Sequence, residues 1–62
     1  MRNRIKKLRK IKGISQIQLA RAVGIQQYRL SLIENNKIND LKYSTAKKIA
    51  RVLNTTPGEL FY

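Results

Sequence analysis

Residues 16–35 read QIQLARAVGIQQYRLSLIEN, and this stretch decides the fold of the chain. Leu19 and Val23 lie four residues apart, which places both on one face of a helix, and Ala20 is small enough for a second helix to cross closely. Gly24 follows, and glycine readily adopts the positive φ that a sharp turn requires. The stretch therefore predicts two short helices joined by a turn at Gly24.

The second of these helices has an inward and an outward face. Its inward positions are Ile25, Leu30 and Ile33. At about 100° per residue, its outward positions form one contiguous stripe, which consists of Gln27, Tyr28, Ser31 and Leu32. This arrangement is typical of a helix-turn-helix, whose second helix enters the major groove of DNA. We expect the stripe to face water or DNA.

The rest of the sequence predicts further helices around this pair. The expected helices cover residues 4–12, 16–23, about 26–35, about 43–53 and 57–61. Asn3 and Ser15 are good N-caps, Gly13 stops the first helix, and a threonine-proline pair opens the last one. Residues 35–40 are polar and rich in turn formers, which predicts a loop. Residues 1–62 are thus expected to form a single all-α domain of five helices.

Charge is the second strong feature of the sequence. Its 62 residues include 14 Lys and Arg but only 3 Asp and Glu, a formal net charge of +11. Seven of the 14 basic residues fall within the first 12 positions. Such an imbalance predicts a polyanionic partner, with nucleic acid the natural candidate.

Cysteine and histidine are both absent from the chain. The sequence therefore lacks disulfides and the usual metal-ligand clusters, and we expect neither a metal nor a cofactor. No nucleophile has an evident base beside it, so we expect no catalytic residues and no enzymatic activity. No apolar stretch has signal-peptide length or approaches the roughly 20 residues needed to span a bilayer. We expect a cytoplasmic protein that does not contact membranes.

Gln27 is the strongest candidate for reading a base. Its amide can engage N6 and N7 of adenine together, a contact that discriminates between bases by about 1–3 kcal/mol. Tyr28 offers a ring to a thymine methyl or a hydroxyl to a phosphate, Ser31 offers a hydroxyl, and Leu32 offers an apolar patch. Packing against a neighbouring helix is the alternative role for Tyr28 and Leu32. The residues expected to contact phosphates are Gln16, Arg29, Asn36, Lys37, Asn39 and Lys42.

The three acids are so few that each invites a structural role. Glu34 falls at the edge of an inward helix face and Arg9 follows Leu8 on the first helix, so the two can meet as a partly buried ion pair that orients helices. Glu59 is placed to complete the N-cap of the last helix.

Between Ile5 and Phe61 the chain resembles the Cro/C1-type (XRE-like) helix-turn-helix proteins of phages and bacteria. The matching elements are Leu8-Arg9 with Gly13, Ile14-Ser15-Gln16, Leu19-Ala20, Val23-Gly24-Ile25, Leu30, Ile33-Glu34-Asn35, and Ile49-Ala50 with Leu53. The resemblance implies a compact five-helix, lambda-repressor-like domain whose third helix lies in the major groove. It also implies an ion pair between Arg9 and Glu34. The positions that it places toward DNA are Gln16, Gln27, Tyr28 and Leu32.

The sequence departs from the family pattern at a few turn positions. Asn36 stands where glycine is common, but asparagine tolerates the left-handed conformation better than most residues. Gln26 and Lys42 stand where a small capping residue is usual. The sequence therefore fixes the first residues of the helices expected at about 26–35 and about 43–53 only to within a residue or two.

These features predict sequence-specific binding to double-stranded DNA and a transcriptional role, foremost as a repressor that occupies its operator. Two copies are expected on the half-sites of a near-palindrome, about 34 Å apart, because one helix reads too few base pairs. The expected dimer surface consists of Leu53, Thr55, Pro57, Phe61 and Tyr62. Since the chain stops just past the fifth helix, no small-molecule effector is expected.

Two other functions stay open at this point. The first is an antitoxin-like protein-interaction module whose DNA binding is secondary, which co-purification with a neighbouring protein would favour. The second is a sequence-indifferent binder of RNA or membrane surfaces driven by charge alone. Such a binder would have equal affinity for scrambled DNA, whereas a specific binder prefers its operator by at least about a thousandfold.

Overall fold

The computed structural model describes residues 2–38 and 40–62. Its helices follow in the order α1 (Ile5–Lys12), α2 (Gln16–Val23), α3 (Gln27–Glu34), α4 (Tyr43–Val52) and α5 (Pro57–Leu60). The predicted all-α architecture is confirmed, and each predicted helix end lies within one residue of the observed one. None of the described helices is long and apolar enough to cross a membrane.

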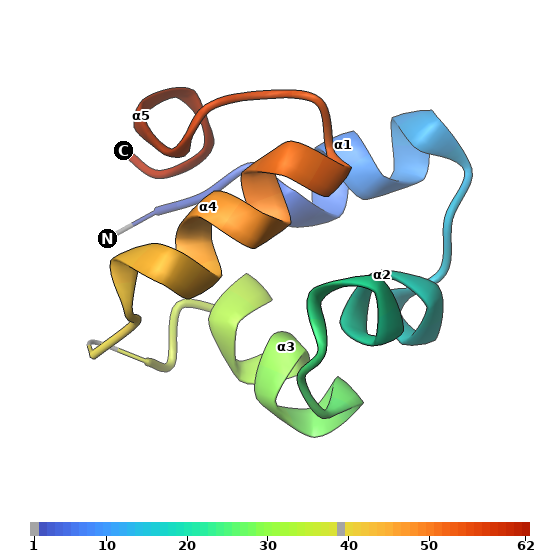
Figure 1. The fold of residues 1–62 in the computed structure, drawn as a ribbon, viewed down its shortest axis with the longest axis horizontal. Helices are drawn as coiled ribbons and strands as arrows, with labels where there is room; N and C mark the ends of the chain where they lie inside the picture. Colours follow the sequence, from blue (N-terminus) through green and yellow to red (C-terminus); the bar gives the residue numbers. More distant parts are fainter. Residues whose placement is uncertain (1, 39) are drawn as a thin grey trace.

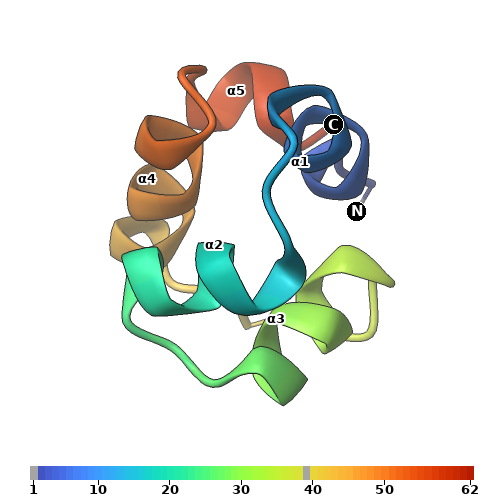
Figure 2. The same cartoon turned by 90° about the vertical axis from the view of Figure 1, so that its right-hand side faces the viewer.

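The helices are arranged around α4, which crosses the middle of the fold with α5 above it, α3 below it and α1 behind it (Figure 1). α2 packs against both α3 and α4, and α5 packs against α4. In the turned view, α1 lies toward the upper edge and α3 at the lower edge (Figure 2). The turn between α2 and α3 therefore sets α3 at one edge of the domain, where its outward face is free of other helices.

The core consists of small and branched apolar side chains from all five helices and from the residue that follows α4. Its buried members among the described residues are Ile5, Leu19, Ala20, Val23, Leu30, Ile33, Ala46, Ile49, Ala50, Leu53 and Leu60. A chain of this length can bury only about 60% of its unfolded surface, so few side chains must fix each helix. α3 contributes only two of them, Leu30 and Ile33.

Local capping explains where α2 begins and ends. The Ser15 hydroxyl accepts a hydrogen bond from the Gln18 backbone N–H at 3.0 Å, and the Gln18 side chain accepts one from the Ser15 N–H at 2.7 Å. This reciprocal capping box satisfies two N–H groups that would otherwise lack partners. At the other end Gly24 adopts φ 87°, a left-handed conformation that strains residues with a side chain. The predicted start and turn are both confirmed.

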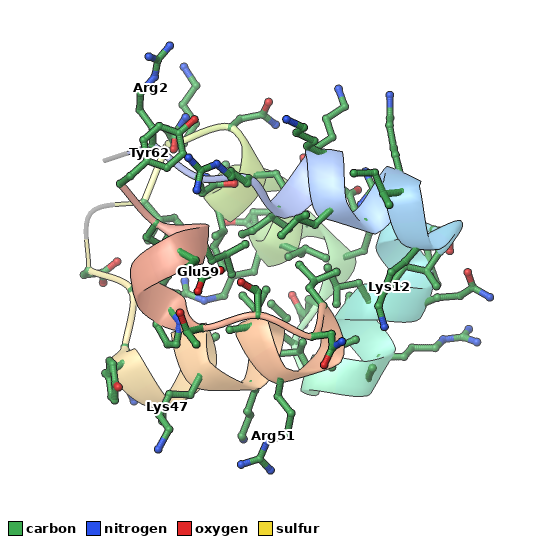
Figure 3. All side chains as sticks on the ribbon, turned by 90° about the horizontal axis from the view of Figure 1, so that it is seen from above. Arg2, Lys12, Lys47, Arg51, Glu59 and Tyr62 are labelled. Carbon is green, nitrogen blue, oxygen red and sulfur yellow. The ribbon has the colours of Figure 1, made fainter. Side chains whose placement is uncertain are left out.

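The two ends of the chain meet, which the sequence analysis does not anticipate. The backbone N–H of Arg2 donates to the Tyr62 carbonyl at 2.7 Å, and the Tyr62 N–H donates to the Arg2 carbonyl at 2.8 Å. Figure 3 shows both side chains at the same corner of the molecule. The Arg4 guanidinium lies 4.4 Å from the centre of the Tyr62 ring. These contacts close the domain across α1 and α5.

Candidate nucleic-acid interface

The outward face of α3 presents its first turn most fully. Gln27 and Tyr28 are exposed, with 66% of the Tyr28 surface accessible, whereas Leu30 is fully buried. Ser31 and Leu32 follow on the next turn and are half-buried. The side chains that extend furthest are thus those at the amino-terminal end of α3, the end that reaches base edges in a helix-turn-helix.

The first turns of α2 and α3 are joined through two glutamines. The Gln27 side-chain N–H donates to Gln16 Oε1 at 3.3 Å. The Gln16 Nε2 in turn donates to Glu34 Oε1 at 3.3 Å. Gln16 is half-buried, while Gln27 is exposed. The glutamine at the most exposed end of α3 is therefore tied to the carboxylate at the other end of the same helix.

Arg9 and Glu34 form a nearly buried ion pair at the base of this chain of contacts. Arg9 Nε lies 3.0 Å from Glu34 Oε2, and the two side chains are only 11% and 3% exposed. A second Arg9 nitrogen donates to Glu34 Oε1 at 3.3 Å, and a third donates to the Ile14 carbonyl at 3.2 Å. Because all of these bonds are directional, the pair fixes the orientation of α3 relative to α1.

Both ends of this network could be predicted from the residue pattern, but the links between them could not. Gln16 was expected at a phosphate and Gln27 at a base, and nothing in their separation along the chain indicates that their side chains touch. A usable signal is that each glutamine occupies the first residue of its helix. The turn at Gly24 brings the end of α2 to the start of α3, and only the angle at which the two helices cross brings Gln16 to Gln27, which a sequence pattern alone does not specify.

The other expected phosphate contacts that the structure describes all lie at the surface. Arg29, Asn36, Lys37 and Lys42 are exposed. Asn36 adopts φ 59°, the left-handed conformation predicted for it. Its side-chain Oδ1 accepts a hydrogen bond from Asn3 Nδ2 at 2.9 Å. Asn39 lies outside the described residues.

Asn3 adds a contact to α3 that the sequence analysis misses. Its Nδ2 also donates to the Ile33 carbonyl at 3.0 Å, while its Oδ1 accepts from the Ile5 N–H at 3.0 Å. The prediction that Asn3 is the N-cap of α1 is wrong by one residue, because the helix begins at Ile5 and Arg4 is its N-cap. The Asn3 side chain nevertheless accepts a hydrogen bond from the first N–H of α1 and holds the carboxyl end of α3.

The expected dimer surface is wrong in one member. Leu53 is only 4% exposed and belongs to the core cluster, because as the first residue after α4 it continues the buried face of that helix. Thr55, Pro57 and Phe61 are half-buried, and Tyr62 is exposed. Pro57, the first residue of α5, and Phe61, which follows α5, border an apolar groove of about 340 Å³. The residues that line this groove are Leu41, Tyr43, Ala46, Pro57, Gly58 and Phe61.

Comparison with known proteins places this geometry in a family. A helix-turn-helix family model (HTH_3) matches residues 5–60. A protein described as an uncharacterized HTH-type transcriptional regulator, from Archaeoglobus fulgidus, is 38% identical over 61 residues, which cover 98% of this chain and 86% of the relative.

Two solved structures share the fold. The restriction-modification controller protein C.AhdI from Aeromonas hydrophila is similar with a TM-score of 0.84 and 33% identity, over 94% of this chain and 86% of that one. A chain of a SinR protein/SinI protein complex is similar with a TM-score of 0.80 and 35% identity, over 87% of this chain and 52% of that one. The chain belongs to the Cro/C1-type (XRE-like) helix-turn-helix family of DNA-binding transcriptional regulators.

Proposed function

We propose that this protein binds a specific double-stranded DNA operator as a homodimer and represses transcription by occupying it. The observation that carries the proposal is the exposed first turn of α3, where Gln27 is held by Gln16. A net charge of +11 supplies attraction to the phosphate backbone, which adds affinity without selecting a sequence.

Gln27 keeps the groups that it needs to read adenine. A glutamine amide has two N–H donors and one carbonyl acceptor. One N–H donates to Gln16 Oε1, which leaves the second N–H for adenine N7 and the carbonyl for adenine N6. Because the first bond restrains the amide before DNA arrives, less rotational freedom is lost when the bases are contacted.

The remaining contacts divide between bases and phosphates. Tyr28 is exposed enough to meet a thymine methyl or a phosphate, while Ser31 and Leu32 contribute the parts of their side chains that remain accessible. The backbone N–H groups of Gln16 and Ile17 precede the N–H groups that bond to Ser15 and can donate to a phosphate beside Gln16. The proposed phosphate contacts are Gln16, Arg29, Asn36, Lys37, Asn39 and Lys42.

A dimer follows from how little DNA one α3 can read. Paired half-sites about 34 Å apart would double the reading surface. The apolar groove beside Pro57 and Phe61 is the surface that we propose for the second copy, joined by Thr55 and by the exposed Tyr43 and Tyr62. Aromatic side chains of this kind are enriched in the centres of protein interfaces.

Selection from a random duplex pool tests the proposal directly. We expect recovered sites to contain an inverted repeat with half-site centres about one helical turn apart, bound at least about a thousandfold more tightly than scrambled DNA. A pool that shows no enrichment would leave only charge-driven binding. Placing the selected site across a promoter or far upstream then tests the mechanism, since occupancy predicts repression only from the overlapping position.

A further inference from the structure

The outward side of α1 carries a second concentration of positive charge. Ile5 is fully buried and Arg9 is engaged with Glu34, which defines the inward side of the helix. At about 100° per residue, Lys7 and Lys10 fall on the side opposite Ile5 and Lys6 lies next to Lys10, and all three are exposed. We group them with the exposed Arg2, which precedes α1 in the chain, and call these four residues the α1 basic face.

The α1 basic face points away from the outward face of α3 that carries Gln27 and Tyr28. The two helices turn their inward sides toward each other, since Arg9 of α1 reaches Glu34 of α3 at 3.0 Å. Figures 1 and 2 both show α1 in the upper part of the fold and α3 at its lower edge. A straight duplex seated on Gln27 and Tyr28 therefore leaves the α1 basic face in solvent.

Nothing within the described residues neutralises these charges. No carboxylate there lies within ion-pair distance of Lys6, Lys7 or Lys10. Like charges three and four residues apart on one helix repel each other, and a line of phosphates would relieve that repulsion. The cations of α4 differ, because Lys47 and Arg51 border a hollow that also contains Glu59. Figure 3 shows these two side chains extending from the side of the molecule opposite Arg2.

The chemistry of the α1 basic face fits the backbone of a duplex better than a single strand. Single-strand sites combine cations with aromatic side chains on which bases stack. Residues 5–12 contain no aromatic residue, and the ring of Tyr62, beside Arg2, already has the Arg4 guanidinium 4.4 Å from its centre. Lys6 and Lys10 are about 6 Å apart along the helix axis. The phosphates of one DNA strand repeat regularly along its backbone, so the two flexible ammonium groups can each meet one of two neighbouring phosphates.

We propose that the α1 basic face binds the phosphate backbone of a second DNA duplex without reading its sequence, so that a chain seated on its operator tethers another DNA segment. The inference rests on the proposed function, because α3 holds the first duplex. The residues assigned to the second site are Arg2, Lys6, Lys7 and Lys10.

A two-duplex capture experiment tests this assignment. One duplex carrying the selected site is immobilised and loaded with protein, and a fluorescent duplex without the site is then added. Wild type should retain the fluorescent duplex. The variant Lys6→Gln/Lys7→Gln/Lys10→Gln should lose capture at least about tenfold and lower its salt slope by about 0.9 per removed charge, while operator affinity on the first duplex changes little. Glutamine and lysine have similar helix propensities, so circular dichroism should show an intact fold.

The matched control removes three charges from another face. Lys47→Gln/Lys48→Gln/Arg51→Gln should keep most of the capture. Equal loss in both variants would show a net-charge effect and overturn the assignment. Capture that survives in the α1 variant would also overturn it, as would operator affinity that falls together with capture. The assignment would fail as well if wild type bound the first duplex and captured no second one. Failure of wild type to prefer the first duplex over a scrambled one would refute the proposed function and this inference together.

Discussion

Glu34→Ala is the substitution whose consequence the structure defines most sharply. It removes the carboxylate that accepts two hydrogen bonds from Arg9, at 3.0 and 3.3 Å, and leaves a guanidinium that is only 11% exposed and retains its bond to the Ile14 carbonyl. Removing one partner of a buried pair costs about 3–5 kcal/mol. A domain of 62 residues has a free energy of unfolding of about 3–9 kcal/mol in total, so Glu34→Ala should bring it close to unfolding at room temperature.

Urea denaturation followed by circular dichroism measures this loss. In a thermal scan, each kcal/mol should lower the Tm by about 4–8 °C. The companion variant Arg9→Met/Glu34→Leu removes both charges and keeps similar side-chain volumes, and it should be near neutral or more stable than wild type. A stable double variant beside an unstable single one would show that the cost arises from the unpaired charge and not from lost packing.

The outcome that refutes the reasoning is a small loss. If Glu34→Ala costs less than about 1 kcal/mol, the pair behaves like an exposed one, and the burial seen here does not describe the protein in solution. The double variant also has a functional readout, because Gln16 loses its acceptor on Glu34. We expect operator affinity to fall by roughly 1 kcal/mol, the worth of one hydrogen bond, with binding to random duplex unchanged.

Three further predictions concern the reading helix and its turn. Gln27→Ala should cost about 1–3 kcal/mol on the selected operator and almost nothing on random DNA in fluorescence anisotropy, and equal losses on both would end the base-reading assignment. Lys37→Ala should weaken both DNAs alike and lower the salt slope by about 0.9, and an unchanged slope would remove Lys37 from the phosphate contacts. Gly24→Ala should cost about 1–2 kcal/mol of stability because Gly24 has φ +87°, whereas Gly58→Ala should be neutral or gain up to about 1 kcal/mol. An added Cβ meets nothing within 4 Å at either glycine, so equal melting temperatures for the two variants would rule out backbone strain as the cause.

Features that depend on neighbours in sequence could be predicted closely. The capping box of Ser15 and Gln18 starts α2 where the residue types place it. Gly24 and Asn36 adopt the left-handed conformations expected of them. The fourth helix ends within one residue of its expected end, and Asn54 follows with φ 59°. Each of these outcomes is decided within a few residues, where steric and hydrogen-bonding preferences act without help from the rest of the fold.

Features that depend on distant residues could not be predicted in the same way. Leu53 continues the apolar face of α4, and only the path of the chain into α5 decides whether it is covered; it is buried, not part of a dimer surface. Leu41 and Tyr43 line the groove beside Phe61 because α5 folds back over the start of α4. The backbone pairing of Arg2 with Tyr62 likewise needs both ends of the chain in place.

The network that orients α3 links the proposed base-reading amide to the residues that hold the fold. α3 buries only Leu30 and Ile33, and two apolar contacts leave rotation about the helix axis poorly restrained. Directional bonds supply the restraint, from Arg9 to Glu34 at the carboxyl end and from Gln27 to Gln16 at the amino end. Gln16 also donates to Glu34. The Glu34 carboxylate, which holds α3 in the fold, therefore also restrains Gln16, the partner of the Gln27 amide that we propose to read a base. A substitution at Glu34 must therefore act on unfolding and on DNA discrimination together, whereas one at Gln27, which is exposed, should act on discrimination alone.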